Sequence, residues 1–102
     1  MKILISKEQA LTIQGLLAQL SKRNDVREFD VLYNPLLPKE FMVRYKSFFV
    51  TEDGGISIEI KYVCINRQGD KNDCQELFGD GFYNVLRDYT VIKLTNPSIE
   101  VI

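Results

Sequence analysis

The side chains that come closest to a chemical site lie in residues 66–81 (NRQGDKNDCQELFGDG), which hold four carboxylates, one thiol and three glycines. A calcium loop needs oxygen ligands at alternate positions, then a glycine, and later a closing glutamate. Counted from Asp70, the segment has Cys74, Gln75 and Gly81 where the third ligand, the glycine and the glutamate belong. Phosphate loops and dinucleotide fingerprints need glycine spacings and a lysine that are also missing here.

A helix start is the simpler interpretation of the same segment. Aspartate followed three residues later by glutamate is a capping pair, in which Asp73 accepts from first-turn amides and Glu76 reaches back. A short helix is therefore predicted from Asp73, ended or kinked by Gly79. Two alternatives stay open, an acidic loop that contacts a protein and a divalent cation site. Both would use the carboxylates of Asp70, Asp73, Glu76 and Asp80.

Few catalytic or metal-binding sites can be built from this chain, because it has two cysteines and no histidine. Cys64 and Cys74 cannot make a four-ligand zinc site or a CxxC motif. A disulfide between them is geometrically possible, although cytosolic chains usually keep thiols reduced. The helix dipole would favour a Cys74 thiolate, but nearby carboxylates oppose it. Without histidine the common triads are excluded, and no spacing singles out a carboxylate pair such as Asp30 and Glu59. We predict no enzyme, no metal and no cofactor.

Length and composition bound the class of protein. At 102 residues, 45% hydrophobic and 26% charged, the chain fits one globular domain spanning residues 1–102. No apolar run approaches the roughly 20 residues that cross a bilayer, and three apolar residues near the N-terminus are too few for a secretory signal. We therefore expect a cytoplasmic protein without membrane contact. A net charge of −1 argues against a protein built mainly to coat nucleic acid.

The elements that must position these residues begin with a short strand at residues 2–5 and a helix at residues 7–22. Ser6 and Gln9 have the spacing of a capping box at the helix start. Apolar residues recur along one face at three- and four-residue steps, at Ala10, Ile13, Leu17 and Leu20. Gly15 lies inside this pattern, which suggests that another backbone packs closely there.

Strand patterns dominate the rest of the chain. Residues 27–33 alternate like a half-buried strand, and the proline-containing stretch 34–38 ends it. Residues 40–50 and 56–65 flank an Asp-Gly-Gly sequence at 53–55, which predicts a tight antiparallel hairpin. Residues 82–89 have helical spacing, and two closing strands follow. The expected fold is α+β: an antiparallel sheet of about four to six strands with one long N-terminal helix packed on one face and a short second helix.

One face of the predicted hairpin suggests a nucleic-acid-binding function. Alternation assigns Arg44, Lys46 and Phe48 to one face, and we place Lys61 beside them, as a basic surface for single-stranded nucleic acid. Tyr45 and Phe49 fall on the other face together with Ile58, Ile60 and Tyr62 of the second strand, which weakens that hypothesis. This apolar face is expected to pack against the first helix.

The favoured prediction is a small protein-binding module that acts stoichiometrically on a protein partner, such as a nucleic-acid-binding enzyme. Phage and mobile elements encode inhibitors or adaptors of host machinery of this size, including anti-restriction and anti-CRISPR factors. The contact would use the mixed face of the sheet, an exposed edge near residues 34–38, or the acidic residues of 66–81, which would occupy a basic channel on the partner.

Overall fold

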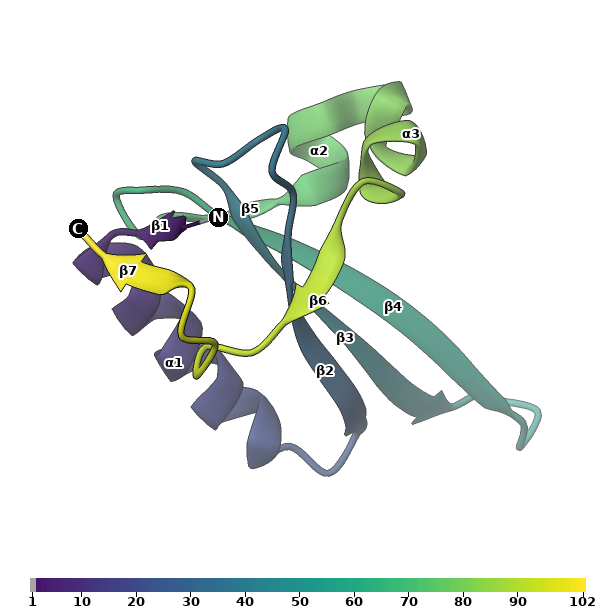
Figure 1. Ribbon diagram of the computed structural model, residues 1–102. Helices are drawn as coiled ribbons and strands as arrows, with labels where there is room; N and C mark the ends of the chain where they lie inside the picture. Colours follow the sequence, from purple (N-terminus) through teal and green to yellow (C-terminus); the bar gives the residue numbers. More distant parts are fainter. Residues whose placement is uncertain (1) are drawn as a thin grey trace.

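The computed structural model describes residues 2–102 as an α+β fold, as predicted (Figure 1). A five-stranded antiparallel sheet has the strand order β5-β4-β3-β2-β6, and β1 pairs with β7 in a separate two-stranded parallel sheet. The elements are β1 (Ile3–Ile5), α1 (Lys7–Ser21), β2 (Val26–Tyr33), β3 (Phe41–Val50), β4 (Ile56–Ile65), β5 (Lys71–Asp73), α2 (Cys74–Phe78), a 3-10 turn (Gly79–Gly81), α3 (Phe82–Leu86), β6 (Thr90–Ile92) and β7 (Ile99–Val101).

The predicted capping box starts α1. The Gln9 amide donates to Ser6 Oγ at 3.0 Å, and the Ser6 amide donates to Gln9 Oε1 at 3.2 Å. The buried Gln9 side chain also donates from Nε2 to the Ile65 carbonyl at 2.7 Å, which fixes the helix start against β4. The expected close packing at Gly15 is wrong, because no heavy atom from outside the helix's own backbone lies within 4 Å of the place where a Cβ would stand.

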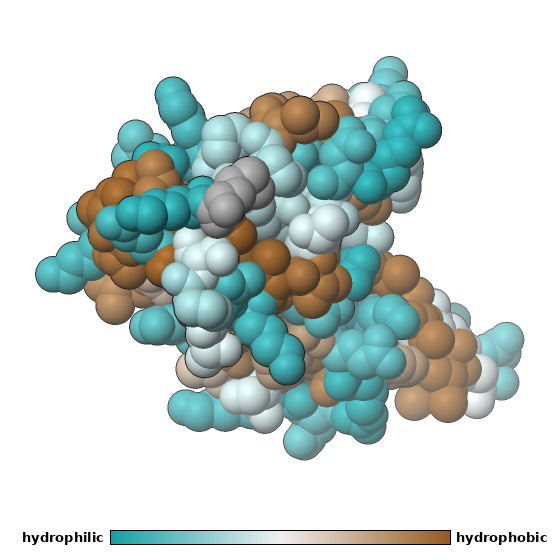
Figure 2. Space-filling view, viewed as in Figure 1, coloured by the Kyte–Doolittle hydropathy of each residue, from teal (hydrophilic) through white to brown (hydrophobic). Residues whose placement is uncertain are grey.

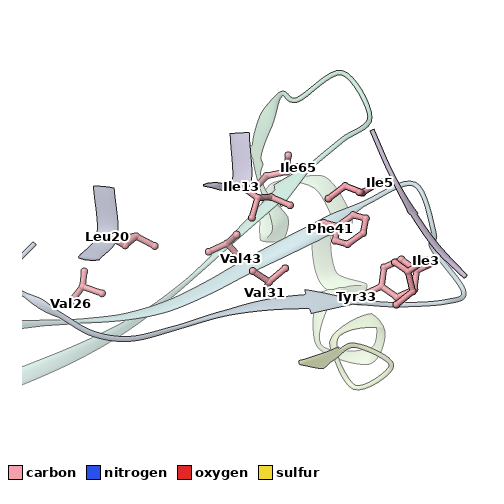
Figure 3. Close-up of a cluster of buried hydrophobic side chains, with 10 residues drawn as sticks. All are labelled: Ile3, Ile5, Ile13, Leu20, Val26, Val31, Tyr33, Phe41, Val43 and Ile65. Atoms are coloured by element: carbon pink, nitrogen blue, oxygen red, sulfur yellow. The ribbon is translucent and has the colours of Figure 1, made fainter. Parts of the chain in front are cut away.

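The first core lies between α1 and the sheet (Figure 3). Ile13 and Leu20 of α1 are fully or almost fully buried against residues of β2, β3 and β4, with β1 closing one end. A fully buried side chain of this size contributes roughly 1.5–3 kcal/mol relative to an exposed one. The members of the first core are Ile3, Ile5, Ile13, Leu20, Val26, Val31, Tyr33, Phe41, Val43 and Ile65. The apolar face predicted for the helix is therefore confirmed as the face that packs on the sheet.

A second core lies on the opposite face of the sheet, under α2 and α3. It contains Leu32, Met42, Cys64, Cys74, Phe82 and Tyr89. Residues 66–81 do more than begin the predicted short helix, because β5 extends the sheet and Cys74 is fully buried in this core. The physical reason is that Leu32, Met42 and Cys64 make this end of the sheet apolar on its second face as well, so a second layer must cover it.

The loop of the β3–β4 hairpin decides which side chains share a face. Val50 lies opposite Ile56, so five residues form the loop instead of a two-residue turn. The Thr51 amide donates to the Gly55 carbonyl at 2.9 Å, and Gly54 has a φ of 83°, which a residue without a Cβ adopts readily.

The hairpin register corrects the predicted pairing of faces. A turn centred on Asp53 and Gly54 would give a register that differs by one residue and would send every β4 side chain to the other face. Residues directly opposite each other in an antiparallel pair lie on the same face. Ile58, Ile60 and Tyr62 therefore share a face with Phe48, Lys46 and Arg44, and not with the first core as predicted.

Candidate functional site

The acidic residues of 66–81 are spread over several elements. The Asp73 carboxylate caps α2, accepting from the amides of Gln75 at 2.9 Å and Glu76 at 3.2 Å, which confirms the aspartate half of the predicted capping pair. Asp70 closes a turn in which its amide donates to Asn66 Oδ1 at 2.9 Å. Glu76 and Asp80 are exposed. Within residues 2–102, no group of three potential ligands is placed to hold a metal ion.

The two thiols meet inside the second core. Cys64 Sγ and Cys74 Sγ are 2.6 Å apart, and both side chains are fully buried. The thiol contact with Cys64 and the loss of solvent both raise the pKa of Cys74 far above its usual range. Cys74 is therefore a protonated thiol at neutral pH in the folded protein, and the helix dipole does not make it a nucleophile.

The cations of the predicted nucleic-acid face are all held in ion pairs. Arg44 contacts Asp30 at 2.9 Å between nitrogen and oxygen, and Lys46 contacts Glu28 at 3.0 Å. Lys61 contacts Glu59 at 2.6 Å.

The sheet separates the residues of the predicted basic surface, and it also separates Asp30 from Glu59. Lys61 lies opposite Tyr45, so it is on the other face from Arg44, Lys46 and Phe48, and the four residues do not form one basic surface. The physical reason is the hairpin register set by the five-residue loop. For the same reason Asp30 and Glu59 lie on opposite faces and cannot act as an acid–base pair.

A hydrophobic patch covers the end of the β3–β4 hairpin that neither helix layer reaches. The exposed fractions are 76% for Val50, 75% for Ile56, 57% for Ile58 and 43% for Ile60, and half-buried Phe48 lies beside them. Figure 2 shows hydrophobic residues gathered over this end of the hairpin. The second core covers the same face only at the other end, around Met42 and Cys64. The patch is therefore a continuation of the sheet's second face without a cover.

The outer edge of β4 is open beside this patch. Among the described residues, β5 pairs only with Val63, Cys64 and Ile65, which leaves the seven residues 56–62 without a neighbour on that side. Backbone groups in an antiparallel pair alternate between facing the partner strand and facing away from it. The hydrogen-bonded pair of Thr51 and Gly55 sets this alternation for the hairpin.

The alternation assigns a direction to each backbone group of β4. Odd-numbered residues of β4 direct their N–H and C=O groups toward β3, and even-numbered residues direct theirs outward. Two neighbouring bonds agree with it, because the Asn66 amide donates to Asp70 on the β5 side and the Phe48 amide donates to Asp25 on the β2 side. The outward groups belong to Ile56, Ile58, Ile60 and Tyr62.

We call the open edge at residues 56–62 together with the hydrophobic patch the β4 surface. The residues whose backbone groups face outward also carry side chains on the uncovered face, so one stretch of chain offers hydrogen bonds and apolar area together. Sequence reasoning missed this surface, because the isoleucines were assigned to the core. The alternation of these isoleucines is visible in the sequence, but the register between β3 and β4, which decides the face they occupy, is not.

Comparison of the chain with protein-family models, with curated proteins and with solved structures gave no match. Within residues 2–102, no helix is long and apolar enough to cross a membrane. A functional interpretation therefore depends on the chemistry of the β4 surface, the acidic residues and the thiol pair.

Proposed function

We propose that this protein is a binding module that acts by stoichiometric contact with a protein partner, and that the β4 surface is its contact site. The observation that carries the proposal is an unpaired seven-residue strand edge joined to exposed isoleucines. Natural sheets usually shorten, charge or cover such edges because they pair with other chains. An inhibitor or adaptor of host machinery, as phage and mobile elements encode, needs only a surface of this kind.

The partner segment that fits is an extended chain that adds a strand beside β4. Main-chain hydrogen bonds to the outward groups of residues 56–62 would supply affinity, and alternate side chains would supply specificity. Apolar residues at alternate positions would cover Ile56, Ile58 and Ile60, which are all exposed. On the opposite face the segment would meet Glu59 and Lys61, so residues of complementary charge are favoured there.

The exposed side chains of the β4 surface gain free energy when a partner covers them. Full burial of an isoleucine contributes roughly 1.5–3 kcal/mol, so the exposed parts of four aliphatic residues offer several kcal/mol to a partner that covers them. Part of this free-energy gain is offset by the translational and rotational entropy that the two molecules lose on binding. A single-stranded nucleic acid would bind more weakly, because Arg44, Lys46 and Lys61 are already paired with carboxylates and are less available to phosphate groups.

An alternative contact is the acidic segment with Asp70, Glu76 and Asp80, which are all exposed and lie before, within and after α2. Asp73 is the least available of the acidic residues, because its carboxylate oxygen is engaged in capping α2. This segment and the β4 surface use different residues, so separate substitutions distinguish them.

The test is quantitative affinity purification from the source cell with four forms of the full chain. They are the wild type, an Ile58→Pro variant, an Ile60→Lys variant and a Leu11→Lys control, since Leu11 is exposed on α1 away from the β4 surface. A partner retained by the wild type and the control and lost by both β4 variants supports the proposal. A partner that all four forms retain would refute it.

Hydrogen exchange on the purified complex then identifies the mode of contact. Strand addition predicts that the partner slows exchange at the amides of Ile58, Ile60 and Tyr62 by at least tenfold, because those N–H groups gain acceptors. Slowing confined to residues 70–80 would instead assign the contact to the acidic segment. Slowing of β4 amides in a pure sample at high concentration would identify a second copy of the chain as the occupant.

A further inference from the structure

Cys64 and Cys74 come together from two elements that the chain brings face to face. Cys64 lies in β4 opposite Asn72 of β5, and Cys74 begins α2 two residues after that pair. The chain therefore folds back over β4 at this point, and the two sulfur atoms are 2.6 Å apart. A disulfide bond is about 2.05 Å long, so the two sulfur atoms need only a small movement to bond.

We propose that Cys64 and Cys74 are a disulfide-forming pair, and that their oxidation fastens the α2–α3 layer to the sheet. The bond would join the first residue of α2 to β4 inside the second core, beside Met42, Phe82 and Tyr89. It would close a short loop that contains β5 and the turn at residues 66–70. This inference does not depend on the identity of a binding partner, because it concerns the covalent state of the chain itself.

The oxidant that the pair needs is a small disulfide such as oxidised glutathione. A Cys74 thiolate attacks one glutathione sulfur and releases one glutathione thiolate, which leaves a mixed disulfide. A Cys64 thiolate then attacks the Cys74 sulfur, forms the protein disulfide and releases the second glutathione thiolate. The two protons of the protein thiols end on the two glutathione molecules. One disulfide is reduced and one is formed, so atoms and electrons balance.

Access to the thiols requires local opening, because both are fully buried. The burial and mutual contact that raise the pKa of Cys74 also keep it protonated in the closed form. The elements that cover the pair are short, since β5 has three residues and α2 has five. Short elements of this kind open at a lower free energy than the whole domain. Oxidation is therefore expected to be slow in the native protein and faster under mild destabilisation.

The consequence of oxidation reaches the β4 surface. Phe82 of α3 packs edge-on against Tyr62 with ring centroids 5.0 Å apart, and Tyr62 ends the open edge of β4. A bond between α2 and β4 restrains the layer that carries Phe82. The amides of Tyr62 and its neighbours are therefore expected to exchange more slowly in the oxidised form than in the reduced form.

The experiment uses the full chain in a series of glutathione redox buffers, with free thiols alkylated after unfolding. The expected product is a monomer in which digestion yields one peptide joining Cys64 and Cys74, with a Tm on the order of 10 °C above the reduced form. A Cys64→Ala, Cys74→Ala double variant is the control, and its Tm should not respond to the buffer. The wild-type peptide analysis stays decisive if that variant folds poorly.

Several results would contradict the proposed bond between Cys64 and Cys74. Two alkylated cysteines in every oxidising buffer, a stable mixed disulfide with glutathione, or cross-links only between molecules would each overturn the pairing. The oxidation rate should rise at least threefold in urea well below the unfolding midpoint. An unchanged rate would overturn the opening step.

Discussion

A matched pair of proline substitutions at neighbouring positions of β4 tests the direction in which this strand's backbone points. Ile58 directs its N–H outward, whereas Glu59 directs its N–H toward Ser47 of β3. Proline lacks an N–H and is tolerated in sheets only where that group is not needed for pairing. Ile58→Pro should therefore leave the β3–β4 pairing in place, and Glu59→Pro should break it.

The expected magnitudes follow from the contacts of each residue. Ile58 is 57% exposed and has no strand beside its amide, so Ile58→Pro should cost about 1 kcal/mol, mainly through lost side-chain contacts. Glu59→Pro removes a ladder hydrogen bond worth about 1 kcal/mol and leaves the facing acceptor without a donor, for about 1–3 kcal/mol more. It also removes the exposed ion pair with Lys61, whose contribution is small. The total for Glu59→Pro is about 2–4 kcal/mol.

Urea unfolding followed by circular dichroism measures both free energies of unfolding, with an unchanged slope as the check that the same surface is exposed. The reasoning requires the Glu59→Pro loss to exceed the Ile58→Pro loss by at least 1 kcal/mol. Equal losses, or a larger loss for Ile58→Pro, would show that the outward groups have been assigned to the wrong residues. The outward hydrogen-bonding groups of residues 56–62 would then belong to residues whose side chains lie on the other face of the sheet, and the proposed combination of strand addition with burial of the isoleucines would be rejected.

Three further outcomes follow from the structure. Gln9→Leu should lower the free energy of unfolding by about 2–4 kcal/mol in a urea titration, because the Ser6 amide loses its acceptor and the Lys39 and Ile65 carbonyls each lose a hydrogen bond from the buried Gln9 side chain. Glu40→Gln should stabilise the fold near pH 7 and have no effect below about pH 4. Desolvation raises the pKa of Glu40 in the folded protein, so ionisation of its carboxyl group destabilises the fold as pH rises. Unfolding measured across this pH range tests the prediction. Reversing the acidic charges of 66–81 other than Asp73 should leave the Tm nearly unchanged, whereas Asp73→Ala should lower stability by about 1 kcal/mol.

Local patterns were sufficient to predict most elements. The serine and glutamine of the capping box are three residues apart in the chain, so the start of α1 at Lys7 needed no tertiary information. Alternating residues predicted β2, β3 and β4, and the aspartate cap predicted the start of α2 near Asp73. These predictions succeeded because the interactions that define each element lie within a few residues of one another.

The candidate site was predicted less well, because it depends on register and layering. Reading the Asp-Gly-Gly sequence as a tight turn shifted the register by one residue, which assigned Ile58 and Ile60 to the core and Lys61 to the wrong face. The three residues of β5 were missed because so short a strand forms only when β4 is already beside it. The close backbone contact predicted at Gly15 is absent. A glycine inside an apolar helical pattern suggested it, but the space beside Gly15 is open.

The sequence by itself determined the fold class, the amphipathic face of α1, the two long hairpin strands and the lack of any histidine for catalysis. The tertiary structure decided which face each strand presents, where the second helical layer ends, and that two thiols ten residues apart in the chain meet. The physical reason is a difference in range. Helix caps and alternation are satisfied by neighbours in the chain, whereas an uncovered sheet face or an open edge is defined only by which other elements fail to reach it.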